Sequence, residues 1–182
     1  SFRDMVEAYD EQIRGLIDGS VDAILIETCF DALNTKAALY ALEKIDRHFP
    51  AVVSVSVNDK SGRTLTGQTL QAFYTSVSHY PLLAFGLNCS LGADDLTPLL
   101  NEVAGFSLFP VSCYPNAGLP NEMGGYDVTP EEMAESVRKM AEAGLLNIIG
   151  GCCGTTPAHI AAISAAVKGL KPRAIPDDPT GG

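Results

Sequence analysis

Apolar segments alternate with helix-like segments along this chain of 182 residues, and this alternation constrains its fold more than any other feature. The expected strands are residues 21–27, 52–57, 82–88, 107–113 and 145–150. The expected helices are residues 4–18, 31–47, 68–78, the segment around 96–103, 130–144 and 157–168. Such alternation predicts right-handed βαβ units and a parallel sheet. The strands are apolar almost throughout, which indicates that helices or other strands cover both faces of the sheet.

Two architectures fit this order: an open doubly wound sheet and part of a (β/α)₈ TIM barrel. No Gly-x-Gly-x-x-Gly fingerprint follows any expected strand, which weakens the dinucleotide-binding alternative. A complete barrel has eight units and usually about 250 residues. We therefore predict an α/β fold, a partial (β/α)₈ TIM barrel made of strands 4–8 with their helices. Residues 1–170 would form this part of the barrel, and the Pro/Asp/Gly-rich residues 171–182 a linker or tail.

Composition excludes several classes of function. The net charge of −10 argues against nucleic acid as a partner. No apolar run approaches the roughly 20 residues of a membrane span, and no signal peptide opens the sequence, so we expect no membrane association. Five cysteines, an odd number, do not suit a secreted disulfide framework. A reducing, cytoplasmic location is the expectation.

Two neighbouring cysteines, Cys152 and Cys153, follow the last expected strand and stand between glycines. They precede Thr156, a good helix N-cap. Adjacent cysteines seldom form a disulfide with each other, because disulfide geometry is narrow, but they can share a soft metal with a third thiolate. Cys89 directly follows the strand 82–88, and parallel strands end at one edge of a sheet. Three thiolates with one open position form a zinc site that activates a ligand, whereas four protein ligands form a structural site.

Other residues near strand ends carry weaker signals. Glu27 ends an apolar strand and suits a substrate with an amino group, although it could instead cap a neighbouring helix. Asn116 follows the strand 107–113 as a further polar group, or as a simple turn residue. Cys29 and Cys113 are expected to be packing residues, since buried cysteine behaves as a small hydrophobe. His159 is expected to be solvated or hydrogen-bonded locally.

Several segments resemble one known family. Gly-Leu-Asn-Cys (86–89) and Gly-Gly-Cys-Cys-Gly-Thr (150–155) are similar to the zinc-cysteine motifs of the homocysteine S-methyltransferases. Three further segments resemble the homocysteine-binding module of cobalamin-dependent methionine synthase more than the modules that use betaine or S-methylmethionine. These segments are residues 26–38, 61–69 and 114–121.

The resemblance implies a (β/α)₈ barrel that binds zinc through Cys89, Cys152 and Cys153. The thiolate of homocysteine would take the fourth position, which Asn116 can approach when substrate is absent, and Glu27 would hold the substrate's amino group. The methyl group would come from methylcobalamin, recharged by 5-methyltetrahydrofolate, to give methionine. Cobalamin- and folate-binding modules of the same polypeptide would be the partners.

The chain departs from the family pattern in one respect. The first strand of the family, with an Asp-Gly pair that helps to bind substrate, and the two units after it are absent from these 182 residues. We therefore expect open strand edges, exposed apolar faces, and a chain that is unstable or aggregates and is inactive by itself. Two alternatives remain open: the same barrel with betaine, S-methylmethionine or S-adenosylmethionine as donor, and a non-catalytic structural zinc or thiol site.

Overall fold

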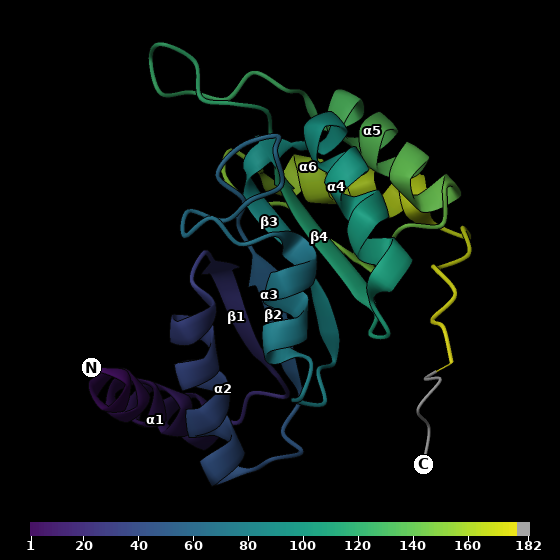
Figure 1. The fold of residues 1–182 in the computed structure, drawn as a ribbon. Coiled ribbons are helices and arrows are strands. Elements are labelled where there is room, and N and C mark those ends of the chain that lie inside the picture. The colour runs from purple at the N-terminus through teal and green to yellow at the C-terminus, as the bar shows by residue number, and fades with distance from the viewer. Residues whose placement is uncertain (178–182) are drawn as a thin grey trace.

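The computed structural model describes residues 1–177 and contains one sheet of five parallel strands (Figure 1). The strands are β1 (Ile24–Cys29), β2 (Ala51–Val55), β3 (Ala84–Gly92), β4 (Val111–Asn116) and β5 (Ile148–Ile149). They are hydrogen-bonded in the order in which they occur in the chain. A doubly wound sheet reverses its strand order at a switch point, whereas a barrel adds each strand on the same side. The sequential order confirms the predicted partial barrel.

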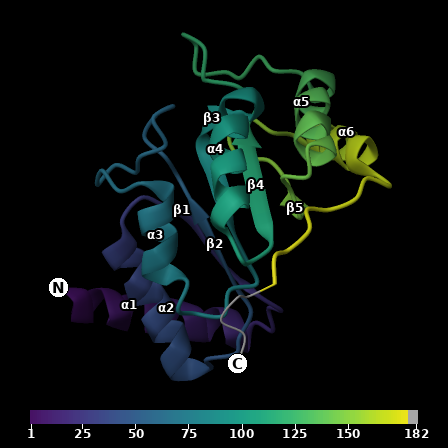
Figure 2. The ribbon, with the colours of Figure 1, turned by 45° about the vertical axis from the view of Figure 1, so that its right-hand side comes forward.

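Six helices accompany the strands: α1 (Phe2–Asp18), α2 (Ala32–Ile45), α3 (Leu70–Val77), α4 (Ala93–Phe106), α5 (Pro130–Glu142) and α6 (Pro157–Val167). Figure 1 shows α2, α3 and α4 side by side along one face of the sheet, and Figure 2 shows β5 at the edge next to α5 and α6. All expected elements are present, with boundaries that differ by a few residues. The largest differences are at β4, which begins at Val111 rather than at residue 107, and at β3, which ends at Gly92 rather than at residue 88.

The two faces of the sheet differ in chemistry, because successive strand residues point to opposite sides. Fully buried apolar side chains such as Val53, Phe85 and Leu87 pack with helix residues in the core. The alternate positions, facing away from the helices, hold small or polar residues. They include Ser54, Gly86, Asn88 and Ser112, and the two serines and Asn88 are buried. The inner face of this partial barrel is therefore polar at these positions, whereas Leu25 and Val52 make it apolar near the start of β1 and β2.

The N-terminal side of the structure exposes apolar surface. Within the described residues, β1 and β5 each pair with a neighbour on one side only, and Leu25 on β1 is 44% exposed. The helical periodicity of residues 31–47 predicts that Leu33 and Tyr40 face inward, but they are 57% and 49% exposed, so this prediction is wrong. Helix α2 instead packs its alanine-rich side, including Ala37 and Ala41, into the core, because small residues allow the helix to approach closely.

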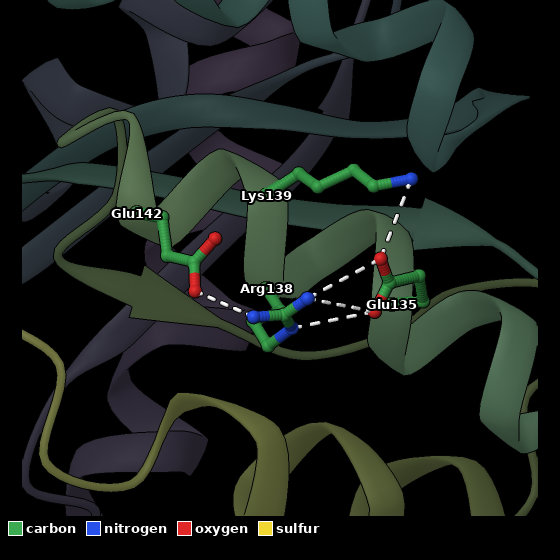
Figure 3. Close-up of polar contacts among 4 residues, drawn as sticks. All are labelled: Glu135, Arg138, Lys139 and Glu142. Carbon is green, nitrogen blue, oxygen red and sulfur yellow. Dashed lines mark hydrogen bonds and ion pairs between the residues drawn. The ribbon is translucent and has the colours of Figure 1, made fainter.

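Helix α5 shows how local sequence sets an element. The sequence Thr-Pro-Glu-Glu at residues 129–132 predicts a capping box, and the structure contains it between Thr129 and Glu132. The helix ends just before Gly144, which has a φ of +70°. On its outer face, Arg138 pairs with Glu135 at 3.1 Å and with Glu142 at 2.6 Å (Figure 3). Exposed pairs of this kind contribute about 0.3–0.5 kcal/mol each. They stabilise the helix modestly and form no site.

The segment after α6 is more ordered than a linker would be. The Arg173 side chain is buried and donates hydrogen bonds to the carbonyl oxygens of Ala104, Ser107 and Phe109 at 2.6–3.3 Å. The predicted division at residue 170 stays a prediction, and residues 178–182 lie outside the described part. In residues 1–177, no helix is both long enough and apolar enough to cross a bilayer.

Candidate metal centre

Two strands, β3 and β5, bring the three predicted cysteines to the carboxyl end of the sheet. Cys89 lies within β3, where the pairing with β4 shifts register between Asn88 and Gly92. Cys89 and Ser90 both have left-handed backbone conformations, with φ of 61° and 64°. Non-glycine residues adopt this conformation at a cost, and such strain is common at functional sites. The distortion interrupts the regular alternation of β3 at the residue that carries the thiol.

The sulfur atoms of Cys89, Cys152 and Cys153 all lie within 4.8 Å of one another. The distance from Cys89 Sγ to Cys153 Sγ is 3.6 Å, and that from Cys152 Sγ to Cys153 Sγ is 3.9 Å. A tetrahedral zinc ion with bonds of about 2.3 Å holds its sulfur ligands about 3.8 Å apart. Two sides of the sulfur triangle therefore match the spacing of zinc ligands, and the third, between Cys89 and Cys152, is at most 4.8 Å long. Cys153 is exposed and the other two are partly exposed, so a small molecule can reach the cluster.

Ionisation of one thiol in the cluster disfavours ionisation of its neighbours. Burial raises the pKa of Cys89, but hydrogen bonds from the Ser90 backbone and from Cys153, Cys152 and Asn116 outweigh burial and lower the pKa overall. Burial and the neighbouring Cys89 charge raise the pKa of Cys152 to about 11. One thiolate thus disfavours a second beside it. A dication bound by the three cysteines would offset this repulsion and favour their deprotonated forms.

Backbone contacts with β4 hold the cysteine loop. Cys152 N donates to Pro115 O at 2.8 Å, and Ala117 N donates to Cys153 O at 2.9 Å. Asn116, which is 4% exposed, accepts a hydrogen bond from Cys153 N at its Oδ1 atom at 3.1 Å. Asn116 is therefore beside the cluster, as predicted, and more than a turn residue. In this structure its amide oxygen is engaged by the cysteine loop.

Sequence reasoning missed Tyr126, which packs against Gly154 in the cysteine loop. Tyr126 belongs to the loop between β4 and α5, which extends beyond the carboxyl end of the sheet in Figure 1. A Cβ atom added to Gly154 would lie 2.5 Å from the Cβ of Tyr126, so the aromatic residue fills the space above the glycine. Burial, a hydrogen bond with Cys153 and the nearby sulfur charges raise the pKa of Tyr126. The signal in the sequence that could have indicated Tyr126 was an aromatic residue in an otherwise polar loop.

His159 joins the same loop to α6. Thr156 N donates to His159 Nδ1 at 3.1 Å, so Nε2 carries the proton and donates to Val128 O at 2.9 Å. The expected local hydrogen bond is present, but the side chain is buried rather than solvated. His159 is therefore a structural link at the end of the loop.

The remaining predicted residues are not members of the sulfur cluster. Glu27 is exposed on the edge strand β1 and precedes Thr28, which has a φ of 57°. Cys29 and Cys113 are buried in the core, as expected of packing residues. Burial raises the pKa of Cys29 to about 11 and that of Cys113 to about 12. These two thiols remain protonated near neutral pH and are unsuited to metal binding.

Residues 1–167 match the family model described as homocysteine S-methyltransferase. The chain belongs to this family. Among solved structures, it is similar to the homocysteine methyltransferase MmuM from Escherichia coli. The oxidized form matches with a TM-score of 0.72 at 26% identity, over 88% of this chain and 52% of that one. The metallated form matches with a TM-score of 0.66 at 28% identity, over 88% and 51%. The chain thus spans about half the length of these relatives.

Proposed function

We propose that this chain is the zinc-binding part of a homocysteine S-methyltransferase that activates the thiol of homocysteine for methyl transfer. The triangle formed by the sulfurs of Cys89, Cys152 and Cys153 carries the proposal. It supplies three soft ligands and leaves one approach open. The existence of a metallated form of the similar Escherichia coli enzyme supports metal binding by this chain.

Different residues of the chain would have different roles in binding and activating the substrate. Zinc, when bound to the three cysteines, would lower the pKa of a substrate thiol and aim its sulfur. Free thiols have a pKa of about 8.5 and are mostly protonated at neutral pH. Glu27 would bind the amino group of homocysteine. Asn116, held against the cysteine loop, would be the group nearest the metal in the absence of substrate.

The proposed methyl donor is methylcobalamin, recharged by 5-methyltetrahydrofolate. The support is the resemblance of residues 26–38, 61–69 and 114–121 to the homocysteine module of cobalamin-dependent methionine synthase. Cobalamin- and folate-binding modules of the same polypeptide, and a cytoplasmic location, belong to this proposal. Betaine, S-methylmethionine and S-adenosylmethionine are the competing donors on the same barrel.

Metal analysis tests the first part of the proposal. X-ray absorption spectroscopy of the zinc-loaded polypeptide should show three sulfur ligands, rising to four when homocysteine is added. Cys89→Ser should lower zinc content strongly, whereas Cys29→Ala, which removes a buried thiol remote from the triangle, should leave it unchanged. Four protein ligands before substrate is added would indicate a structural site and contradict the proposal.

Donor trials test the second part. Methyl transfer to homocysteine should require methylcobalamin, and transfer from betaine without cobalamin would refute this choice. The 182-residue chain expressed by itself should aggregate and be inactive, since it exposes Leu25, Leu33 and Tyr40 beside an open edge strand. A soluble, active monomer of these residues alone would overturn this expectation.

A further inference from the structure

Asn88 occupies the interior position directly before Cys89 on β3. Its side chain is 1% exposed and lies on the inner face of the sheet, paired in register with Tyr114 of β4. A buried primary amide has two donor and several acceptor positions to satisfy. Its partners therefore show which parts of the structure it holds together.

The amide of Asn88 contacts three separate segments. Its Oδ1 accepts hydrogen bonds from Thr28 N at 3.0 Å and from Ser54 Oγ at 2.8 Å. Its Nδ2 donates to Thr28 Oγ1 at 3.0 Å. The same Nδ2 lies 3.9 Å from Cys152 Sγ, within the range of a hydrogen bond to sulfur. One side chain thus connects the end of β1, the middle of β2 and one sulfur of the cluster.

These contacts explain a strained residue. Thr28 has a φ of 57°, which a β-branched residue rarely adopts. Asn88 bonds both the backbone N–H and the hydroxyl of Thr28, and such double anchoring is what maintains a strained conformation. Glu27 immediately precedes Thr28, so the orientation of the Glu27 carboxylate depends on how Thr28 is held.

We infer that Asn88 is a positioning residue that sets the geometry between the sulfur cluster and the Glu27–Thr28 end of β1. This inference rests on the proposed function, in which the thiol of homocysteine goes to the cysteines and its amino group to Glu27. The two groups stand at opposite ends of one small molecule, so the site must hold its two anchors at a constant separation. Asn88 bonds directly to both sides.

The contact with Cys152 has a chemical role as well. A neutral N–H donor stabilises a thiolate without adding a positive charge that would repel a metal ion. Groups that hydrogen-bond to metal ligands orient them, and their loss commonly weakens metal binding about 10- to 100-fold. A purely structural asparagine would lower stability when replaced and leave metal affinity unchanged.

The test compares alanine substitutions of two asparagines, Asn88 and Asn147, in the complete polypeptide. Asn147 also joins two segments, accepting from Val111 N at 2.8 Å and donating to Arg173 O at 2.9 Å, but at the opposite end of the strands. Asn88→Ala should weaken zinc binding about 10- to 100-fold in competition with a chromophoric chelator. Asn147→Ala should lower the thermal unfolding midpoint and bind zinc as the unsubstituted protein does.

A second variant tests the part of the site that would bind the substrate's amino group, and this test does not depend on whether Asn88→Ala folds. Thr28→Val keeps the exposed side chain's shape and removes the hydroxyl that accepts from Asn88. It should raise the KM for homocysteine about three- to tenfold, the effect of one hydrogen bond, with kcat and zinc content preserved.

Three results would overturn the inference. Asn88→Ala could bind zinc as tightly as the unsubstituted protein, or Thr28→Val could leave KM unchanged; either outcome refutes the positioning role and leaves the proposed function standing. An unsubstituted protein that does not bind zinc through sulfur would refute both.

Discussion

Replacing Gly154 with alanine tests whether the loop that carries Tyr126 is packed onto the cysteine turn. Gly154 has a φ of +78°. A left-handed conformation costs an alanine about 1–2 kcal/mol relative to glycine. The added Cβ would also overlap Tyr126, whose Cβ would lie 2.5 Å away. Overpacking of this kind costs about 1–3 kcal/mol. The expected loss in the free energy of unfolding is therefore about 2–5 kcal/mol.

Gly144 provides a matched control. It has a similar φ of +70° at the end of α5, and a Cβ added there would meet no atom within 4 Å. Gly144→Ala should therefore lose only the backbone contribution, about 1–2 kcal/mol. The difference between the two glycine variants measures the contact with Tyr126.

Urea unfolding of the metal-free protein measures these losses, and a double-mutant cycle isolates the contact. In a Tyr126→Gly background, which also removes the Cβ of Tyr126, Gly154→Ala should cost no more than Gly144→Ala. Equal losses for the two glycine variants, or additive effects in the cycle, would refute the argument that Tyr126 covers this turn.

Two further predictions concern stability. Cys113 ionises in the unfolded chain near pH 9 but, when buried, only near pH 12, so its contribution to stability is complete below pH 9 and is lost as pH rises. Because of Cys113, the free energy of unfolding should fall by up to about 1.4 kcal/mol per pH unit above pH 9. It should fall less steeply in Cys113→Ala. Parallel curves of unfolding free energy against pH for the two proteins would contradict this. Arg173→Met should cost about 2–4 kcal/mol, because buried carbonyl oxygens lose their donor. Arg138→Ala on the exposed face should cost less than about 1 kcal/mol, and thermal unfolding of both variants checks the contrast.

The order of elements and the identity of the site's cysteines could be predicted from the sequence. The helix caps at Thr129 and Thr156 are local, and the apolar strands are continuous. Local patterns of this kind depend on neighbouring residues alone. The position of Cys89 and of the Cys152–Cys153 pair at strand ends was enough to bring them together once a parallel sheet was assumed.

Contacts between residues distant in the chain could not be predicted in the same way. Which side of α2 is buried depended on its fit against the sheet, so Leu33 and Tyr40 were misassigned. Arg173 was assigned to the linker because nothing near it in the sequence indicates its acceptors, which lie more than 60 residues earlier. Tyr126 and Asn88 carried no distinctive motif.

The sequence alone determined that this chain forms parallel βα units with three thiols at the ends of their strands. Tertiary structure decided how closely those sulfurs approach, 3.6 Å between Cys89 and Cys153, and which side chains hold them. The physical reason is that periodicity and capping act over a few residues. The geometry of a site is instead set by packing and hydrogen bonds between strands, such as those from Asn88 to Thr28 and Ser54.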